Sequence, residues 1–343
     1  MRVLVTGHNG YIGCVMVPML CAAGHEVVGL DSDLFRAVRI VPYNSGIPEI
    51  RLDIRDMEAE HLAGFDAVIH LAALSNDALS NLNPEITYEI NHAASVRLAR
   101  LAKDAGVKRF LFSSSCSIYG KAGDELVTET GAIDVITPYT ITKARVEKDL
   151  AEMASDDFSP TFLRNATVYG LSPCHSFDLV LNNLVAWACA VGRVYIKSDG
   201  SPWRPTVHVE DVSRAFLAAL TAPREAIHNQ AFNVGQTEEN YSVTELAEIV
   251  REVVPGSYIE YAADGRPDAR SYRVDFSKIR RVLPAFVPKW NVRRGVEQLY
   301  SAYRSAGVAV EDFEGPRFKR VEHIKQLLAS GCLDRSLRWA TAA

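Results

Sequence analysis

Residues 3–13 read Val3-Leu4-Val5-Thr6-Gly7-His8-Asn9-Gly10-Tyr11-Ile12-Gly13, and this stretch decides the fold. Its apolar start is typical of a buried parallel strand, and an apolar helical pattern follows the turn. Glycine at such a turn lets the backbone approach a pyrophosphate, whose charge is attracted by the free N–H groups of the helix. The first glycine interval is one residue longer than in G-x-G-x-x-G, and glycine turns also occur without a ligand. The stretch by itself therefore gives only a weak indication of a phosphate site.

A second apolar strand is predicted over residues 26–30, which completes a β-α-β unit, and Asp31 follows it. A carboxylate at this position accepts hydrogen bonds from the adenosine ribose and repels a 2′-phosphate, so Asp31 favours NAD over NADP. The alternative is a solvated turn aspartate, and Arg36 nearby weakens the preference. Similar apolar strands recur along the first half of the chain. The expected fold is α/β, a Rossmann-type doubly wound parallel sheet with a smaller interleaved C-terminal substrate lobe.

The length of 343 residues predicts two lobes. We expect an NAD-binding Rossmann domain over residues 1–170, with returning segments near 204–238, and a mainly substrate-binding lobe over residues 171–343. The net charge of −5 includes no basic block, which argues against nucleic-acid binding. No leader-like or membrane-spanning apolar run is evident, so a soluble cytoplasmic protein is expected. The six scattered cysteines predict buried free thiols, and the nine histidines show no metal-binding spacing.

Polar residues also follow other predicted strands. Asp53 follows the strand near residue 50, where it is a candidate for the adenine amino group. Asn91 lies on the apolar face of a long helix predicted over residues 84–105. Because a buried amide needs partners, Asn91 is expected to bond either the backbone of a loop at the site or a purely structural group.

The catalytic candidates lie at a further strand end. A hydroxyl-rich run, residues 113–120, follows the strand predicted at 109–112, and a helix opens near Tyr139 with Lys143 four residues later. Residues four apart share a helical face, and an ammonium near a phenol lowers the pKa of the tyrosine. Tyr139 is thus a candidate acid/base, and Ser115 a candidate proton relay. Tyr-x-x-x-Lys on its own is also common as an exposed pair.

The joint order of the glycine turn, Asp31, the serine-rich strand end and Tyr139-x-x-x-Lys143 resembles the extended short-chain dehydrogenases/reductases, within them the NAD-dependent sugar epimerase/dehydratase family. The resemblance covers residues 1–275, and Thr6-Gly7-x-x-Gly10-x-x-Gly13 is the glycine form expected there. It implies NAD as the cofactor and a nucleoside diphosphate sugar as the substrate. It also implies a homodimer built from the helices near residues 84–105 and 139–153.

Within that family, 4,6-dehydratases carry an Asp-Glu pair directly after the residue that matches Ser115, where this chain has Cys116 and Ser117. Neither side chain supplies the acid and base that elimination needs, so a dehydratase is disfavoured. The Ser-Ser-Ser-x-x-x-Tyr-Gly form resembles the UDP-glucose 4-epimerases instead. That resemblance implies epimerisation at C4 through a 4-keto sugar. The alternatives are a 4-ketoreductase of nucleoside diphosphate 4-keto sugars and a non-catalytic cofactor-sensing protein.

The second lobe offers candidate diphosphate ligands. Arg204 and Arg266 suit bidentate contact with a diphosphate, and Asn183 matches a family position that contacts the same group. Sugar specificity is expected near Ser75, Thr167 and His175, whereas the helix predicted over residues 318–328 is expected to be structural.

These patterns and the resemblance together define the predicted site. The predicted catalytic residues are Ser115, Tyr139 and Lys143. The predicted cofactor-binding residues are Gly7, Asn9, Gly10, Tyr11, Ile12, Asp31, Asp53, Ile54, Leu71, Ala72, Ala73, Asn91, Ser113, Tyr139 and Lys143. The predicted substrate-binding residues are Ser75, Ser115, Ser117, Thr167, Asn183, Arg204 and Arg266. No metal ligand is predicted.

Overall fold

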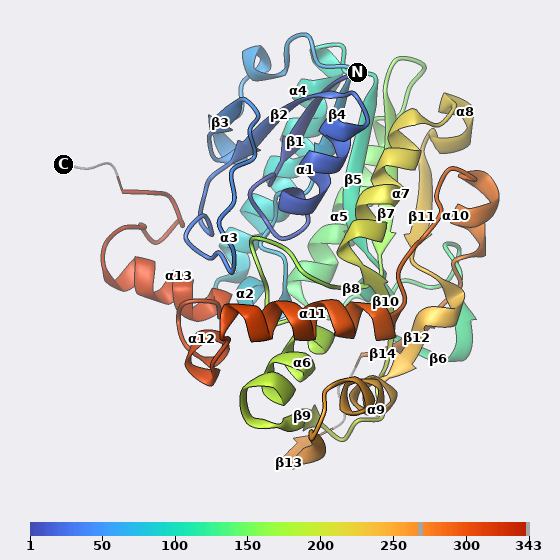
Figure 1. The fold of residues 1–343 in the computed structure, drawn as a ribbon. Helices are drawn as coiled ribbons and strands as arrows, with labels where there is room; N and C mark the ends of the chain where they lie inside the picture. Colours follow the sequence, from blue (N-terminus) through green and yellow to red (C-terminus); the bar gives the residue numbers. More distant parts are fainter. Residues whose placement is uncertain (267–269, 341–343) are drawn as a thin grey trace.

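The computed structural model describes residues 1–266 and 270–340. A seven-stranded sheet of order β11-β7-β5-β4-β1-β2-β3 forms its centre (Figure 1), and each neighbouring pair is parallel. Because the strand order reverses direction between β1 and β4, the sheet is doubly wound, which confirms the predicted fold class. Its strands are β1 (Arg2–Thr6), β2 (Glu26–Asp31), β3 (Glu49–Arg51), β4 (Ala67–His70), β5 (Arg109–Ser115), β7 (Ser159–Asn165) and β11 (Gln230–Val234).

The two faces of this sheet are covered by different helices. Side chains alternate between the faces along each strand, so Val3 and Val5 pack with helices α1 and α7, whereas Leu4 packs with α4 and α5. The helices of these two layers are α1 (Gly13–Ala22), α2 (Asp77–Ser80), α3 (Pro84–Tyr88), α4 (Ser95–Asp104), α5 (Pro138–Glu152), α7 (Val209–Thr221), α8 (Arg224–Ile227) and α10 (Ser277–Val282). Burial on both faces accounts for the continuous apolar runs of the strands.

The second lobe has its own core around α6, α9 and α11. Small sheets connect it to the first lobe, namely β12-β10-β8, β13-β9 and β14-β6. Its helices are α6 (Val180–Val191), α9 (Val243–Val253), α11 (Val292–Ala306), α12 (Val310–Glu314) and α13 (Arg320–Ala329). The strands of the small sheets are β6 (Lys121–Val127), β8 (Thr167–Tyr169), β9 (Arg193–Ser198), β10 (Trp203–His208), β12 (Asn240–Ser242), β13 (Tyr258–Arg266) and β14 (Ser271–Val274). After β10, helix α7 and β11 return to the first lobe, so the lobes are interleaved.

Some sequence predictions need correction. The helix predicted over residues 84–105 is divided, because a π-helical turn at Glu89–Ala94 separates α3 from α4. Helix α1 continues past Pro18 despite the lost N–H. Two of the six thiols expected to be buried, those of Cys21 and Cys332, are exposed. Both lie near the ends of helices, where the apolar pattern gives way to polar residues.

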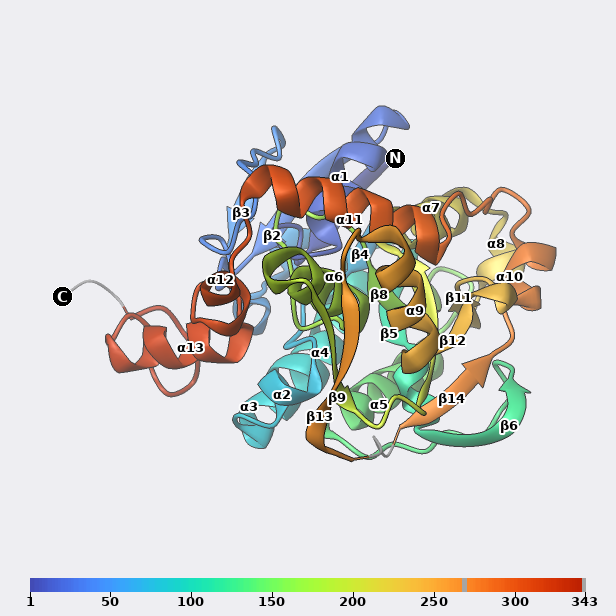
Figure 2. The ribbon, with the colours of Figure 1, turned by 60° about the horizontal axis from the view of Figure 1, so that its bottom comes forward.

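After α11, the C-terminal segment (residues 307–340) forms α12 and α13. These two helices lie on the same side of the molecule as β3 and α2 (Figure 2). Its end returns to the loop after β2, where the Trp339 indole N–H donates to the Ser32 carbonyl at 2.6 Å. No helix in the described part of the chain has the length and apolarity required to cross a membrane.

Candidate active site

One pocket of about 820 Å³ lies at the carboxyl ends of the parallel strands, between the sheet and the second lobe. This is where ligands bind in open α/β sheets. Twenty of the predicted site residues line it: Gly7, Asn9, Gly10, Tyr11, Ile12, Asp31, Asp53, Ile54, Leu71, Ala72, Ala73, Ser75, Ser113, Ser115, Ser117, Tyr139, Lys143, Thr167, Asn183 and Arg204. The tertiary structure thus brings together residues separated by as much as two hundred positions.

The glycine turn is shaped to hold backbone close to a ligand. Gly7 has φ +75°, and a Cβ there would lie 2.7 Å from the Ala72 nitrogen. A Cβ on Gly13 would overlap the His8 carbonyl, whereas a Cβ on Gly10 would meet only the Gly7 carbonyl, at 3.1 Å. Helix α1 begins here without a side-chain cap and without an acidic residue in its first turn. A helix start without a side-chain cap suits phosphate oxygens, so the turn fits the pyrophosphate of a dinucleotide.

Asp31 is positioned by the backbone around it. Its carboxylate accepts the main-chain N–H groups of Asn9, at 3.1 Å, and Asp33, at 2.8 Å. Burial raises the pKa of the Asp31 carboxyl, while these bonds oppose the rise. Arg36, which was expected to weaken the preference for NAD, is paired with Asp33 at 2.8 Å. The observed geometry is compatible with an acceptor for ribose hydroxyls.

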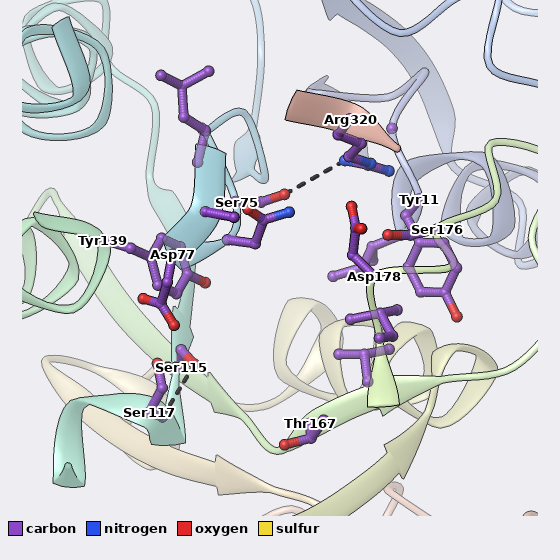
Figure 3. A pocket seen from close by; sticks show the side chains of 18 of the residues that line it. Tyr11, Ser75, Asp77, Ser115, Ser117, Tyr139, Thr167, Ser176, Asp178 and Arg320 are labelled. Carbon is purple, nitrogen blue, oxygen red and sulfur yellow. Dashed lines mark hydrogen bonds between the residues drawn. The ribbon is translucent and has the colours of Figure 1, made fainter. Parts of the chain in front are cut away.

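The three predicted catalytic residues come from β5 and α5 and all line the pocket, and Figure 3 shows Tyr139 and Ser115 on the same side of it. A capping box at Thr137 fixes the start of α5 and leaves Tyr139 and Lys143 on its pocket side. The Lys143 ammonium donates to the Ser113 carbonyl at 2.6 Å and lies 5.6 Å from the centre of the Tyr139 ring. The hydroxyls of Ser115 and Ser117 are 2.8 Å apart.

The prediction that Lys143 lowers the pKa of Tyr139 is wrong for the protein without cofactor. Burial and the nearby charge of Asp77 raise the pKa of the Tyr139 phenol, and a hydrogen bond with Ser115 only partly opposes the rise. Burial also lowers the pKa of the Lys143 amine to about 7. The physical reason is that desolvation disfavours both charged forms at once.

Two other predicted residues do not line the pocket, although Asn91 bonds the backbone of a pocket loop, which is one of the two arrangements expected for it. Both polar atoms of the Asn91 amide bond the main chain of Leu74, at 2.8 and 3.0 Å, so Asn91 fixes the loop after β4 and does not line the pocket. His175 is fully buried against Tyr303, with 2.5 Å between its Nε2 atom and the phenol oxygen, and it is also absent from the pocket wall. A buried polar side chain is as often satisfied by the core as by a ligand.

Cys116 and Ser117, which follow the hydroxyl of Ser115, contain no carboxylate. The Cys116 thiol is buried and donates to the Arg164 carbonyl at 3.0 Å, and Cys116 is not among the residues that line the pocket.

Of the two arginines predicted to bind a diphosphate, Arg204 lines the pocket and donates to the Arg270 and Trp203 carbonyls, at 2.5 and 2.8 Å. The side chain of Arg266 lies outside the part of the chain that the structure describes.

Sequence reasoning missed several charged residues of the pocket. Asp77 faces the Tyr139 side, and its carboxylate accepts the Thr137 hydroxyl at 2.6 Å and pairs with Arg270. Asp178 and Arg320 lie across the pocket from Tyr139 (Figure 3). No local motif marks these three residues, and Arg320 belongs to the helix that was expected to be purely structural. That expectation is wrong because the C-terminal segment returns to the pocket.

The doubly wound sheet, the uncapped glycine turn and Asp31 together define an NAD-binding protein of the Rossmann type. A family model described as the NAD dependent epimerase/dehydratase family matches residues 3–235. The chain belongs to this family of NAD-dependent enzymes.

Individual relatives show how broad the family is. The chain is 29% identical to UDP-glucose 4-epimerase of Bacillus subtilis (strain 168), over 87% of this chain and 94% of the relative. It is 26% identical to UDP-glucuronic acid decarboxylase 1 of Arabidopsis thaliana, over 89% of this chain and 70% of the relative. Among solved structures, MoeE5 in complex with UDP-glucuronic acid and NAD superposes with a TM-score of 0.78 at 29% identity, covering 89% of this chain and 100% of MoeE5.

Proposed function

We propose that this enzyme is an NAD-dependent epimerase that inverts C4 of a nucleoside diphosphate sugar. The observation that carries the proposal is the set of Ser115, Tyr139 and Lys143 in one pocket, without a carboxylate at positions 116 and 117. Hydroxyl, phenol and ammonium suffice for moving one proton at a sugar hydroxyl. The likeness to UDP-glucose 4-epimerase supports this choice, as does the position of the pocket between the two lobes.

In this proposal, Tyr139 removes the proton of the sugar 4-hydroxyl, directly or through Ser115, and later returns it. Bound NAD supplies a hydride acceptor for C4 and a positive charge that favours the phenolate form of Tyr139. Lys143 orients the site through its bond to Ser113. The 4-keto sugar turns within the pocket and accepts hydride on its other face, so no net oxidation occurs and NAD stays bound between turnovers.

Elimination of water, as the names of some solved structures in the family indicate for those proteins, is disfavoured here. That step needs an acid and a base beyond a phenol and a serine. Asp77 is the carboxylate nearest the Tyr139 side, and its two oxygens are engaged by Thr137 and Arg270. We therefore propose that Asp77 shapes the wall of the pocket and does not protonate the sugar.

The nucleotide and sugar are tested with a thermal-shift screen of UDP-, dTDP-, GDP- and CDP-hexoses. The best hit is then supplied with deuterium at C4, without added cofactor. Epimerase action predicts a mixture of C4 epimers that both retain the deuterium at C4. Obligatory consumption of added NADPH would contradict the proposal in favour of a 4-ketoreductase, and transfer of the deuterium to C6 would contradict it in favour of a dehydratase. Tight binding without any turnover would indicate a cofactor-sensing protein.

A further inference from the structure

Arg320 reaches the pocket because the C-terminal segment docks against the first lobe. Two of its side chains bond carbonyls of the loop that follows Asp31: Trp339 donates to Ser32 at 2.6 Å, and the His323 ring lies 3.1 Å from the Leu34 carbonyl oxygen. Asp178 lies beside Arg320 at the start of α13 (Figure 3). Helix α13 is thereby anchored with its first residue facing the pocket.

The guanidinium of Arg320 is buried and poorly satisfied. The residue is 5% exposed, and its Nε–H has no hydrogen-bond partner. Its two remaining contacts are long, 3.5 Å to the Ser75 hydroxyl and 4.0 Å to the Cys174 sulfur, while the Phe35 ring centre lies 4.8 Å away. Within the described part of the chain, no carboxylate oxygen lies within 4.0 Å of this guanidinium. The charge of Arg320 acts on the carboxyl of Asp178, but the two groups make no close ion pair. A desolvated charge without a close ion pair is costly, so this site is suited to an anion that the protein does not supply.

A second cationic feature faces the same part of the pocket. The start of α1, at Gly13, has neither a side-chain cap nor an acidic residue. Figure 3 shows Arg320 on the same side as Tyr11 of the glycine turn, across the pocket from Tyr139 and Ser115. The charge of Arg320 is close enough to act on the phenol of Tyr11. A diphosphate carries two negative charges. The start of α1 would hold it on one side and the guanidinium of Arg320 would hold it on the other.

We propose that Arg320 binds the pyrophosphate of NAD, and that the C-terminal segment is therefore part of the cofactor site. The diphosphate of the sugar nucleotide is the competing anion. The cofactor is favoured because the Phe35 ring, which lies on the loop that follows Asp31, and the Ser75 hydroxyl both belong to the first lobe and contact Arg320. Arg204, on β10, is placed to serve the substrate instead.

The test measures ligand binding to protein from which NAD has been removed. Calorimetric titrations with NAD, and separately with UDP, are compared for the native protein, Arg320→Gln and Arg317→Gln. Arg317 is the matched control, because it lies on the same segment but is exposed and pairs with Asp312 at 2.9 Å. Arg320→Gln is expected to weaken NAD binding about 10- to 100-fold, the usual size for a lost charge-assisted contact, with UDP binding changed less than about twofold.

A second variant separates a ligand role from a structural one. Arg320→Met removes a buried charge that makes no close ion pair, so the cofactor-free protein is expected to keep or raise its Tm, while the Tm gain on adding NAD shrinks. NAD affinity within about twofold of native in Arg320→Gln would overturn the proposal. A greater loss of UDP than of NAD binding would overturn it in favour of the substrate diphosphate. Failure of both variants to fold would overturn it in favour of a structural role.

Discussion

The ammonium of Lys143 is 2.6 Å from the carbonyl oxygen of Ser113, and this bond ties α5 to the end of β5 beneath the pocket. Lys143 is only 4% exposed, which lowers the pKa of its amine, and the charge of Glu147 one helical turn away opposes that change. The bond therefore positions the lysine, while burial determines whether it is charged.

The first prediction concerns the stability of the cofactor-free protein as a function of pH. Because the pKa of Lys143 is about 7 when folded and near 10.5 when unfolded, the unfolded state binds more protons between these values. Lys143 therefore destabilises the fold fully below pH 7, and this penalty is relieved as pH rises toward 10, at about 1 kcal/mol per pH unit. Urea titrations give the free energy of unfolding of Lys143→Met and of the native protein. The free energy of the variant minus that of the native protein should decrease between pH 7 and pH 9. A constant difference would contradict this expectation.

The second prediction concerns proton transfer by Tyr139. Tyr139→Phe removes only the hydroxyl, so the protein should fold and retain NAD while kcat falls by about 10²- to 10⁴-fold. Turnover, NAD content and Tm are measured together. Tyr258→Phe, at a position that is 55% exposed, is the control and should match the native protein. Activity of Tyr139→Phe within about tenfold of native would refute the proposed role.

The third prediction separates the roles of two glycines in the same turn. A Cβ on Gly13 would overlap the carbonyl groups of Gly7 and His8. Gly13→Ala should therefore destabilise the fold by about 1–3 kcal/mol. A Cβ on Gly10 would face the pocket with a single close neighbour. Gly10→Ala should therefore keep its stability but lose at least about tenfold in NAD affinity. Urea titration and NAD titration of both variants check this, and equal effects on stability would argue against it.

The fourth prediction concerns the choice of cofactor. Asp31→Asn keeps one oxygen that can accept the N–H of Asn9 or of Asp33, which bond different oxygens of the carboxylate, and it removes the charge that repels a 2′-phosphate. The ratio of NADP to NAD dissociation constants should fall about tenfold. The control is Asp56→Asn, whose carboxylate is 46% exposed and pairs with Arg338. An unchanged ratio in Asp31→Asn would show that the preference has another origin.

The predicted fold follows from local patterns. The apolar runs near residues 3, 27 and 68 each form a strand of the parallel sheet. A strand that is buried on both faces is apolar along its whole length, so its own residues are enough to predict it. Strands β6, β13 and β14 were missed. They are polar, pair only in two-stranded sheets, and owe their conformation to distant segments.

The sequence by itself determined the glycine turn, the acidic strand end and the serine, tyrosine and lysine of the site, because each depends on spacing along one strand or one helix. Only the tertiary structure decided the electrostatics and the far wall of the pocket. Burial raised the pKa of Tyr139, against the expected direction, and lowered the pKa of Lys143. Arg320 entered the pocket through the return of a segment three hundred residues away from Tyr11. Desolvation and long-range docking depend on the whole fold, so no local pattern encodes them.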